Sequence, residues 1–188
     1  ANRLPPDLAD AMARAGVFGM VAPPTSGEAP VDVAVMLEVI EMCAIASGSA
    51  GWCAMIGSTS AVSGAYLPTT AAAEIFADPM TIVGGVFAPT GSARPVDGGY
   101  RLSGHWSWGS GSQHCQWLAL GAVVQDADGG SVRTPMLYVP AEDVEIVPNW
   151  DVMGLRGTGS HDLRVDDVFV PADRSVLLTA SPVCDEPT

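Results

Sequence analysis

The sequence predicts an α+β protein, with an N-terminal helical domain at residues 1–79 and an antiparallel β-barrel or sandwich as a middle domain at residues 80–188. Two patterns carry this prediction. Apolar residues recur at helical spacing in the first part, and short β-branched segments alternate with turns in the second. A doubly wound parallel sheet is not expected, because strands and helices do not alternate. With 48% hydrophobic residues, the chain can bury a substantial core.

The N-terminal part predicts four helices. Pro5–Asp7 is a suitable helix start, and apolar residues three and four positions apart continue from Val31 to Ala46. A hydroxyl group at Thr69 or Thr70 would cap the last, short helix. The second and third helices carry few charges, so both are expected to be largely buried. The expected ranges are 5–16, 31–46, 52–68 and 69–76.

Beyond Pro79 the sequence predicts a series of short strands. Asp97–Gly99 is a favourable hairpin turn between two of them, and Asp126–Gly130 is a second turn that follows a strongly apolar strand. The number and spacing of these segments are typical of a sandwich or barrel. The expected strands are 82–87, 100–105, 117–124, 135–139, 144–147 and 163–170.

Charge and cysteine usage narrow the classes of partner and compartment. Eight basic and 21 acidic residues give a formal net charge of −13, so neither nucleic acid nor an anionic membrane is expected as a partner. No window approaches the about 18 unbroken apolar residues of a membrane span. The cysteines form no CxxC pair, which favours free thiols in a reducing compartment and hence a cytoplasmic protein. They are Cys43, Cys53, Cys115 and Cys184.

The segment Gly104–Trp117, GHWSWGSGSQHCQW, carries the most suggestive set of side chains. A metal site is not expected there. His114 and Cys115 are adjacent, and adjacent strand residues point to opposite faces of a sheet. His105 and His161 add no tight pair of ligands of the kind a zinc site uses.

Nucleophilic catalysis and nucleotide phosphate binding are poorly supported as well. Ser160–Asp162 holds the residue types of a catalytic triad, but a triad needs convergence in space rather than adjacency in sequence. Gly109 and Gly111 do not follow a strand and open a helix, as the glycines of a dinucleotide-binding loop do. The residues therefore favour neither a hydrolase nor a dinucleotide-binding fold.

Two interpretations of the tryptophans remain open on the residues alone. Trp106, Trp108 and Trp117 could form a flat wall for a planar heteroaromatic cofactor. In that case the Gly/Ser run would bring backbone N–H groups to the polar edge of the cofactor, and Ser107 or Ser110 would add a hydroxyl group. Alternatively, the tryptophans are barrel core and the Gly/Ser run is an ordinary loop.

Five motifs follow one another along nearly the whole chain: Gly48–Trp52, Gly85–Ala93, Asp97–Trp106, Met153–Ser160 and Val168–Pro171. In this order they resemble a helix motif, the loop that opens the middle β-barrel, a hairpin and the closing motifs of that barrel in the acyl-CoA dehydrogenase superfamily. The resemblance is strongest to the flavin-dependent monooxygenase-like branch, which includes aromatic hydroxylases and dibenzothiophene monooxygenases.

The resemblance implies a cleft for FAD or FMN between the helices and the barrel. Ser110 would lie nearest the reactive N5/C4a edge of the flavin and is the expected catalytic residue. For Arg156, a solvated turn is an equally good interpretation. No metal is implied. The implied cofactor-binding residues are Phe87, Ala88, Trp106, Ser107, Trp108, Gly109, Ser110, Arg156, Thr158 and Ser160.

Three departures from the family pattern bear on the reaction. Ala88 stands where the family's dehydrogenases carry an acidic residue, and Ser60 stands where many of its hydroxylases carry a histidine. The family's C-terminal four-helix bundle, which supplies a catalytic base, is missing from the 188 residues. Helices that would pack on this bundle are expected to expose apolar surface, so we expect a homo-oligomer or a second chain that carries the bundle.

The preferred interpretation is a flavin-dependent oxidoreductase that oxygenates a small organic substrate, with reduced flavin supplied by a separate flavin reductase. In the first alternative, an acyl-CoA dehydrogenase, FAD accepts a hydride from the β carbon of an acyl-CoA thioester. The carboxylate that removes the α proton would then lie outside this chain. A further alternative, from another functional class, is a catalytically silent binding or assembly module.

Overall fold

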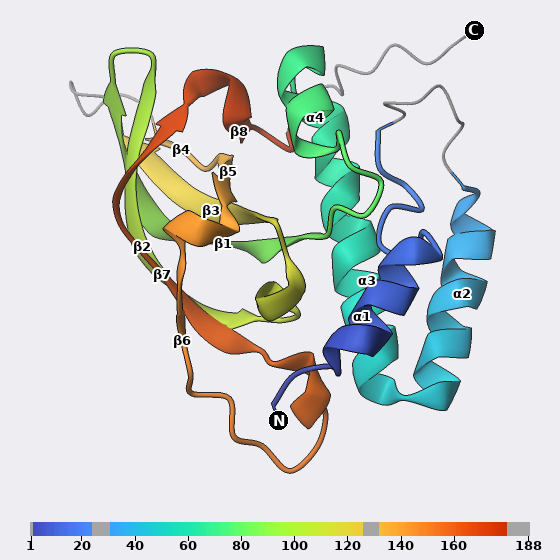
Figure 1. Ribbon diagram of the computed structural model, residues 1–188. Coiled ribbons are helices and arrows are strands. Elements are labelled where there is room, and N and C mark those ends of the chain that lie inside the picture. Colours follow the sequence, from blue (N-terminus) through green and yellow to red (C-terminus); the bar gives the residue numbers. More distant parts are fainter. Residues whose placement is uncertain (1, 24–30, 126–131, 180–188) are drawn as a thin grey trace, which may run out of the picture.

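The computed structural model describes residues 2–23, 31–125 and 132–179, and it has a layer of helices beside a curved β-sheet (Figure 1). The predicted α+β class is confirmed. The helices are α1 (Pro6–Arg14), α2 (Val33–Ala46), α3 (Gly48–Val62) and α4 (Thr69–Ile75), and a 3₁₀ turn, Ser63–Tyr66, follows α3. In these ranges, no helix is long and apolar enough to cross a membrane.

The bounds of α3, predicted as 52–68, and the cap of α4 differ from the prediction. Gly48 is the first residue of α3, because Ser47 acts as its N-cap and the Ser47 Oγ accepts a hydrogen bond from the Ala50 N–H at 3.5 Å. Helix α4 has Pro68 at its N-cap position and no side-chain cap. The predicted cap by Thr69 or Thr70 is therefore wrong.

Helix α2 is far more exposed than its composition predicted. Helix α3 buries eight residues, but Met36 is the only buried residue of α2. The physical reason is the position of α2 at the edge of the molecule, where one side packs on α3 and on the core around Met12 and Phe18 and the outward side is exposed (Figure 1). Its exposed large apolar side chains are Val33, Val35, Leu37, Met42 and Ile45.

The strands form one sheet in the order β6-β7-β2-β1-β3-β5-β8, with β4 paired to β3. Every pairing is antiparallel except that of β1 with β3, which is parallel. The strands are β1 (Val83–Val96), β2 (Gly99–Gly109), β3 (Trp117–Gln125), β4 (Val132–Arg133), β5 (Met136–Pro140), β6 (Glu145–Val147), β7 (His161–Pro171) and β8 (Ser175–Val176).

All six predicted strands are present, although β1 and β2 extend well beyond the predicted ranges. The hairpin between β1 and β2 turns at Asp97–Gly98 as predicted. The second predicted turn, at residues 126–130, lies outside the described residues. The sheet curves so that Leu137 of β5 and Leu163 of β7 share one buried core with Trp106 of β2. Among the described residues, no strand ladder joins β6 and β8, which lie at the two ends of the sheet.

The helices and the sheet also share a core. Leu67 and Ile75, from the α3–α4 region, pack with Val83 of β1 and Tyr138 of β5. The Tyr138 hydroxyl is hydrogen-bonded to the Ser63 hydroxyl, which ties the end of α3 to the sheet. The division into domains at residues 79 and 80 stays a prediction. The shared core fixes the position of α3 relative to β1 and β2, and the candidate site lies between these elements.

Candidate functional site

Exposed aromatic side chains from different elements lie around the C-terminal end of β2. Trp108 of β2 is 72% exposed, Trp52 of α3 is 43% exposed and Phe87 of β1 is 45% exposed. The Trp52 Nε1–H donates to the Ser110 Oγ at 2.9 Å, which places this tryptophan beside the end of β2. Phe87 belongs to residues 87–90 of β1, which bulge out of the β1–β3 ladder. The Thr90 hydroxyl donates to the His105 carbonyl at 3.0 Å and holds that segment against β2.

The backbone of Trp108 has a left-handed conformation, with φ of 68°. Residues other than glycine rarely adopt it, and it costs about 1–3 kcal/mol. The conformation coincides with a register shift between Trp106 and Gly109 in the β2–β7 ladder and with a hydrogen bond from the Ser110 N–H to the Trp108 carbonyl at 2.8 Å. Because of this bulge, Ser107 and Trp108 are both exposed although they are consecutive.

Trp106 lies in the barrel core instead. Its side chain is fully buried, and its Nε1–H donates to the Gly121 carbonyl at 2.7 Å. Gly104 leaves room for the indole, since a Cβ atom there would lie 2.6 Å from it. Only the backbone of Trp106 is therefore left for the predicted flavin contact. Trp117 packs against the core shared by the helices and the sheet, and the Arg174 guanidinium lies over its ring at 4.9 Å.

The structure brings together two segments that the sequence predicted separately, at residues 106–110 and 156–160. The Ser110 and Ser160 hydroxyls are 2.7 Å apart, and the Ser160 and Thr158 hydroxyls are also 2.7 Å apart. The three side chains are buried. A hydrogen bond from the Gly111 N–H to the Thr158 carbonyl, at 2.8 Å, joins the two backbones beside them.

Arg156 has other partners. It begins the 3₁₀ turn η4 (Arg156–Thr158), and its Nη1 lies 3.0 Å from the Asp151 carboxylate and donates to the Val152 carbonyl at 2.8 Å. Its Nη2 donates to the Asn2 Oδ1 at 3.2 Å. No atom of Arg156 belongs to the cluster of three side-chain hydroxyls described above. The predicted contact of Arg156 with a cofactor stays a prediction.

Sequence reasoning missed Trp52 as a site residue. Trp52 was considered only as the last residue of the motif at residues 48–52. A tryptophan in an apolar helix is usually interpreted as a core residue. The only available signal was the composition of its helix, which is rich in Gly, Ala and Ser. The contact with Ser110 depends on the tertiary packing of α3 beside the end of β2, which this composition does not reveal.

The histidines near the site have separate partners. The His105 Nε2 lies 2.9 Å from the Asp162 carboxylate, and the His161 Nδ1 accepts hydrogen bonds from the backbone of residues Asn149 and Trp150. His114 lies apart from both, and burial lowers its pKa. Among residues 2–23, 31–125 and 132–179, no group of three or more potential metal ligands occurs.

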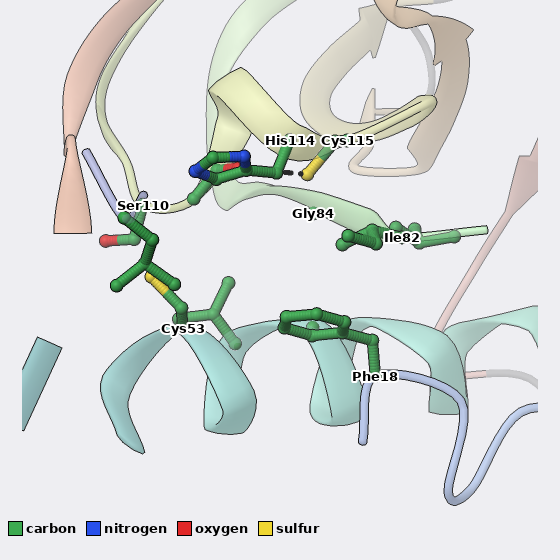
Figure 2. Close-up of a pocket in the computed structure, with 12 residues that line it drawn as sticks. Phe18, Cys53, Ile82, Gly84, Ser110, His114 and Cys115 are labelled. Carbon is green, nitrogen blue, oxygen red and sulfur yellow. Dashed lines mark hydrogen bonds between the residues drawn. The ribbon is translucent and has the colours of Figure 1, made fainter. Parts of the chain in front are cut away.

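A small cavity lies on the inner side of Ser110, between α3 and the turn that leads from β2 to β3 (Figure 2). Figure 2 shows Cys53 and Phe18 on the helix side of the cavity and His114 and Cys115 on the sheet side. The cavity volume of about 10 Å³ is close to that of a single water. It is too small for a planar cofactor.

Burial raises the pKa of the Cys53 and Cys115 thiols to about 12. At pH 8 almost none of either thiol is ionised, and the thiolate is the reactive form. Among the three described cysteines, we expect iodoacetamide to label Cys43 before Cys53 and Cys115, because the raised pKa keeps the latter two thiols protonated until urea exposes them. Peptide mass spectrometry after timed labelling measures this order. Equal labelling rates for the three thiols in the native protein would contradict it.

Comparison with known proteins gives the geometry a chemical context. No family model matches the chain. It is 36% identical over 174 residues to the flavin-dependent monooxygenase oxygenase subunit HsaA of Mycobacterium tuberculosis, covering 92% of this chain and 44% of that protein. It is 35% identical over 175 residues to the oxygenase component of the FADH₂-dependent resorcinol hydroxylase of Rhizobium, covering 93% and 43%. It is 36% identical over 183 residues to the indole-3-acetate monooxygenase of Pseudomonas putida, covering 96% and 46%.

The homologues of this chain are flavin-dependent monooxygenases. A solved structure of XiaF from Streptomyces, in complex with FADH₂ and glycerol, superposes on this chain with a TM-score of 0.87 at 32% identity. The match covers 94% of this chain and 45% of XiaF. The chain thus spans less than half the length of the monooxygenase relatives that it matches.

Proposed function

We propose that the chain is part of the oxygenase component of a two-component flavin-dependent monooxygenase. One atom of dioxygen enters a small aromatic substrate and the other leaves as water, with electrons from reduced FAD or FMN that a separate flavin reductase delivers. The exposed Trp108, next to the buried Ser110 hydroxyl at the end of β2, is the observation that carries this proposal. Two homologues named for resorcinol and indole-3-acetate support an aromatic substrate.

The residues at the end of β2 fit an isoalloxazine ring. Trp108 offers a flat apolar face outside the barrel, where such a ring can stack. Ser107 and Gly109 carry little side chain, which allows the ring edge to approach the backbone. Phe87 and Ala88 are exposed on the neighbouring segment of β1 and extend the apolar surface.

The bound flavin would supply the activation of dioxygen, and the chain would bind and orient it. Stacking on Trp108 would set the plane of the ring, and Ser110 would fix the N5 edge by a hydrogen bond. Trp52 holds the Ser110 hydroxyl in place. The aromatic side chains would also exclude water from the reacting edge, which is the main protection that an oxygenase needs.

The exposed apolar face of α2 supports a partner that covers it, in line with the limited size of such patches on monomers. We propose that this partner is a helical bundle, in a second chain or in a further copy of the protein. The free thiols of Cys43, Cys53 and Cys115 fit the reducing cytoplasm as the place of the reaction.

The proposed function is tested with the protein in the form in which cells make it. Without oxygen, chemically reduced FAD or FMN is expected to remain with the protein on ultrafiltration. When heavy-isotope dioxygen is then admitted with resorcinol or indole-3-acetate as probes, mass spectrometry is expected to find one heavy oxygen atom in the product. Failure to retain either reduced flavin would contradict the proposal. Bleaching of bound oxidised flavin by an acyl-CoA thioester would instead favour dehydrogenation.

A further inference from the structure

The small cavity on the inner side of Ser110 has a lining that consists largely of apolar side chains. It lies between α3 and the turn from β2 to β3, and its volume is about 10 Å³ (Figure 2). The thiols of Cys53 and Cys115 face each other across it from the helix side and the sheet side. The hydrocarbon side chains of the lining are Leu4, Phe18, Ile56, Ile82 and Val83.

A water molecule would be held poorly in this cavity. The Ser110 hydroxyl is hydrogen-bonded to Trp52 at 2.9 Å and to Ser160 at 2.7 Å, and neither partner lines the cavity. Among the lining residues, the His114 Nε2 is the only buried side-chain nitrogen or oxygen without a hydrogen-bond partner. A buried water usually makes about three hydrogen bonds, and apolar cavities stay dry. The cavity therefore suits a small apolar molecule better than a water.

The cavity adjoins the proposed flavin site. Ser110 and Gly111, which follow the last residue of β2, both line it. Gly111 carries no side chain, and a Cβ atom there would lie 3.7 Å from the Cys53 Sγ. On the outer side, the flavin ring and the exposed aromatic side chains would cover the reacting edge. The inner side of Ser110 therefore offers a separate approach to the same edge for a molecule small enough to occupy the cavity.

We propose that this cavity binds dioxygen and delivers it to the flavin from the inner side of Ser110. Dioxygen is small and apolar, so it moves favourably from water into a dry cavity. It consists of two oxygen atoms joined by a short bond, and a small shift of the half-buried Ile56 side chain would adapt the cavity to it. The inference rests on the proposed function and deepens it, because it gives one substrate of the reaction a site of its own.

Such a site would separate the two substrates of the reaction. The aromatic substrate would approach from the exposed side, and dioxygen would arrive through the apolar interior. Water finds few hydrogen-bond partners on the inner side, so the cavity would admit the gas and exclude water from the reacting edge.

Methyl signals in NMR test for dioxygen in the full protein without flavin. Dioxygen is paramagnetic and speeds the relaxation of the nuclei that it touches, so relaxation is compared under dioxygen and under argon. We expect the methyl groups of Leu4 and Ile82 to relax faster under dioxygen than those of Ile75. Ile75 of α4 is the matched control, because it is fully buried in another core and lies outside the cavity lining. Equal effects at Ile82 and Ile75, or a nuclear Overhauser effect from a long-lived water to Ile82, would overturn the inference.

Two substitutions of Cys53 change the cavity in opposite directions. Cys53→Leu fills the cavity, and Cys53→Ala enlarges it. We expect Cys53→Leu to abolish the faster relaxation of Ile82 under dioxygen, and Cys53→Ala to increase it. With reduced flavin bound, Cys53→Leu is expected to slow the reaction with dioxygen about threefold or more in stopped-flow measurements, since fewer complexes then hold dioxygen beside the flavin. Cys53→Ala is expected to react at least as fast as the native protein.

The control variant Cys43→Leu makes the same change on α2, outside the cavity lining, and is expected to leave both the relaxation and the rate at their native values. Effects in the same direction from Cys53→Leu and Cys53→Ala would overturn the inference, because a general loosening of the fold acts alike in both. If the native protein binds no reduced flavin, the proposed function fails, and delivery to the flavin fails with it even where Ile82 reports dioxygen. If the flavin binds and Ile82 does not respond to dioxygen, the inference alone fails.

Discussion

Replacing Trp108 by glycine is expected to weaken flavin binding by about tenfold or more, because the stacking surface is lost. The same change is expected to raise the free energy of unfolding by about 1 kcal/mol, because glycine adopts the left-handed backbone of this position without strain. Flavin titration and urea denaturation measure the two effects. Opposite signs for binding and stability are the signature of a strained backbone conformation that is kept for the function of its side chain.

An exposed aromatic residue of the neighbouring strand β7, beside the start of β2, provides the matched control. Phe169 of β7 is 43% exposed, pairs with Arg101 in the ladder and lies beneath its guanidinium. Phe169→Ala removes a comparable aromatic surface far from Ser110 and is expected to leave flavin affinity unchanged. If Trp108→Gly and Phe169→Ala affect binding equally, Trp108 has no special place in the cofactor site.

Replacing Trp106 by alanine is expected to lower the free energy of unfolding by about 3–5 kcal/mol, the usual cost of deleting a large aromatic core side chain. The side chain is fully buried, and its loss also leaves the Gly121 carbonyl without its donor. Urea denaturation measures the change. Trp106→Phe, which keeps the ring but loses the N–H, is expected to cost about 1–3 kcal/mol, in line with one unsatisfied buried acceptor.

The Trp106 variants separate the two interpretations of the tryptophans that the sequence left open. A core residue changes stability, whereas a residue of a cofactor wall changes binding. A Trp106→Phe protein that unfolds like the native one but has lost its flavin affinity would mean that the ring contacts the cofactor. That result would be incompatible with its burial in the sheet.

Residue patterns predicted the α+β class and most elements because hydrophobic periodicity and turn residues act locally. They could not separate Trp106 from Trp108. Residues two apart on a regular strand share a face, and only the bulge with its left-handed φ at Trp108 sends the two rings to opposite sides. The residue types at positions 104–111 do not predict this bulge.

Features that depend on distant segments were also out of reach. The exposure of α2 depends on which elements pack against it, and its apolar composition alone predicted burial. After the antiparallel hairpin of β1 and β2, the chain crosses to the other edge of β1, where β3 runs in the same direction as β1. This parallel pairing depends on that crossing and not on a local pattern. The hydrogen bonds of the Ser110 hydroxyl join it to Trp52, 58 positions away, and to Ser160, 50 positions away. Motif resemblance placed Ser110 and Ser160 near one cleft without showing their contact.

The central claim is that the exposed end of β2, and not the buried tryptophan, holds the flavin. The most direct test follows the indole N–H signals of the nitrogen-15-labelled protein by NMR during anaerobic addition of reduced flavin. The signals of Trp108 and Trp52 are expected to shift on binding, and those of Trp106 and Trp117 are expected to stay in place. A shift of the Trp106 signal with Trp108 unchanged, or no shift at any of these residues, would contradict the account.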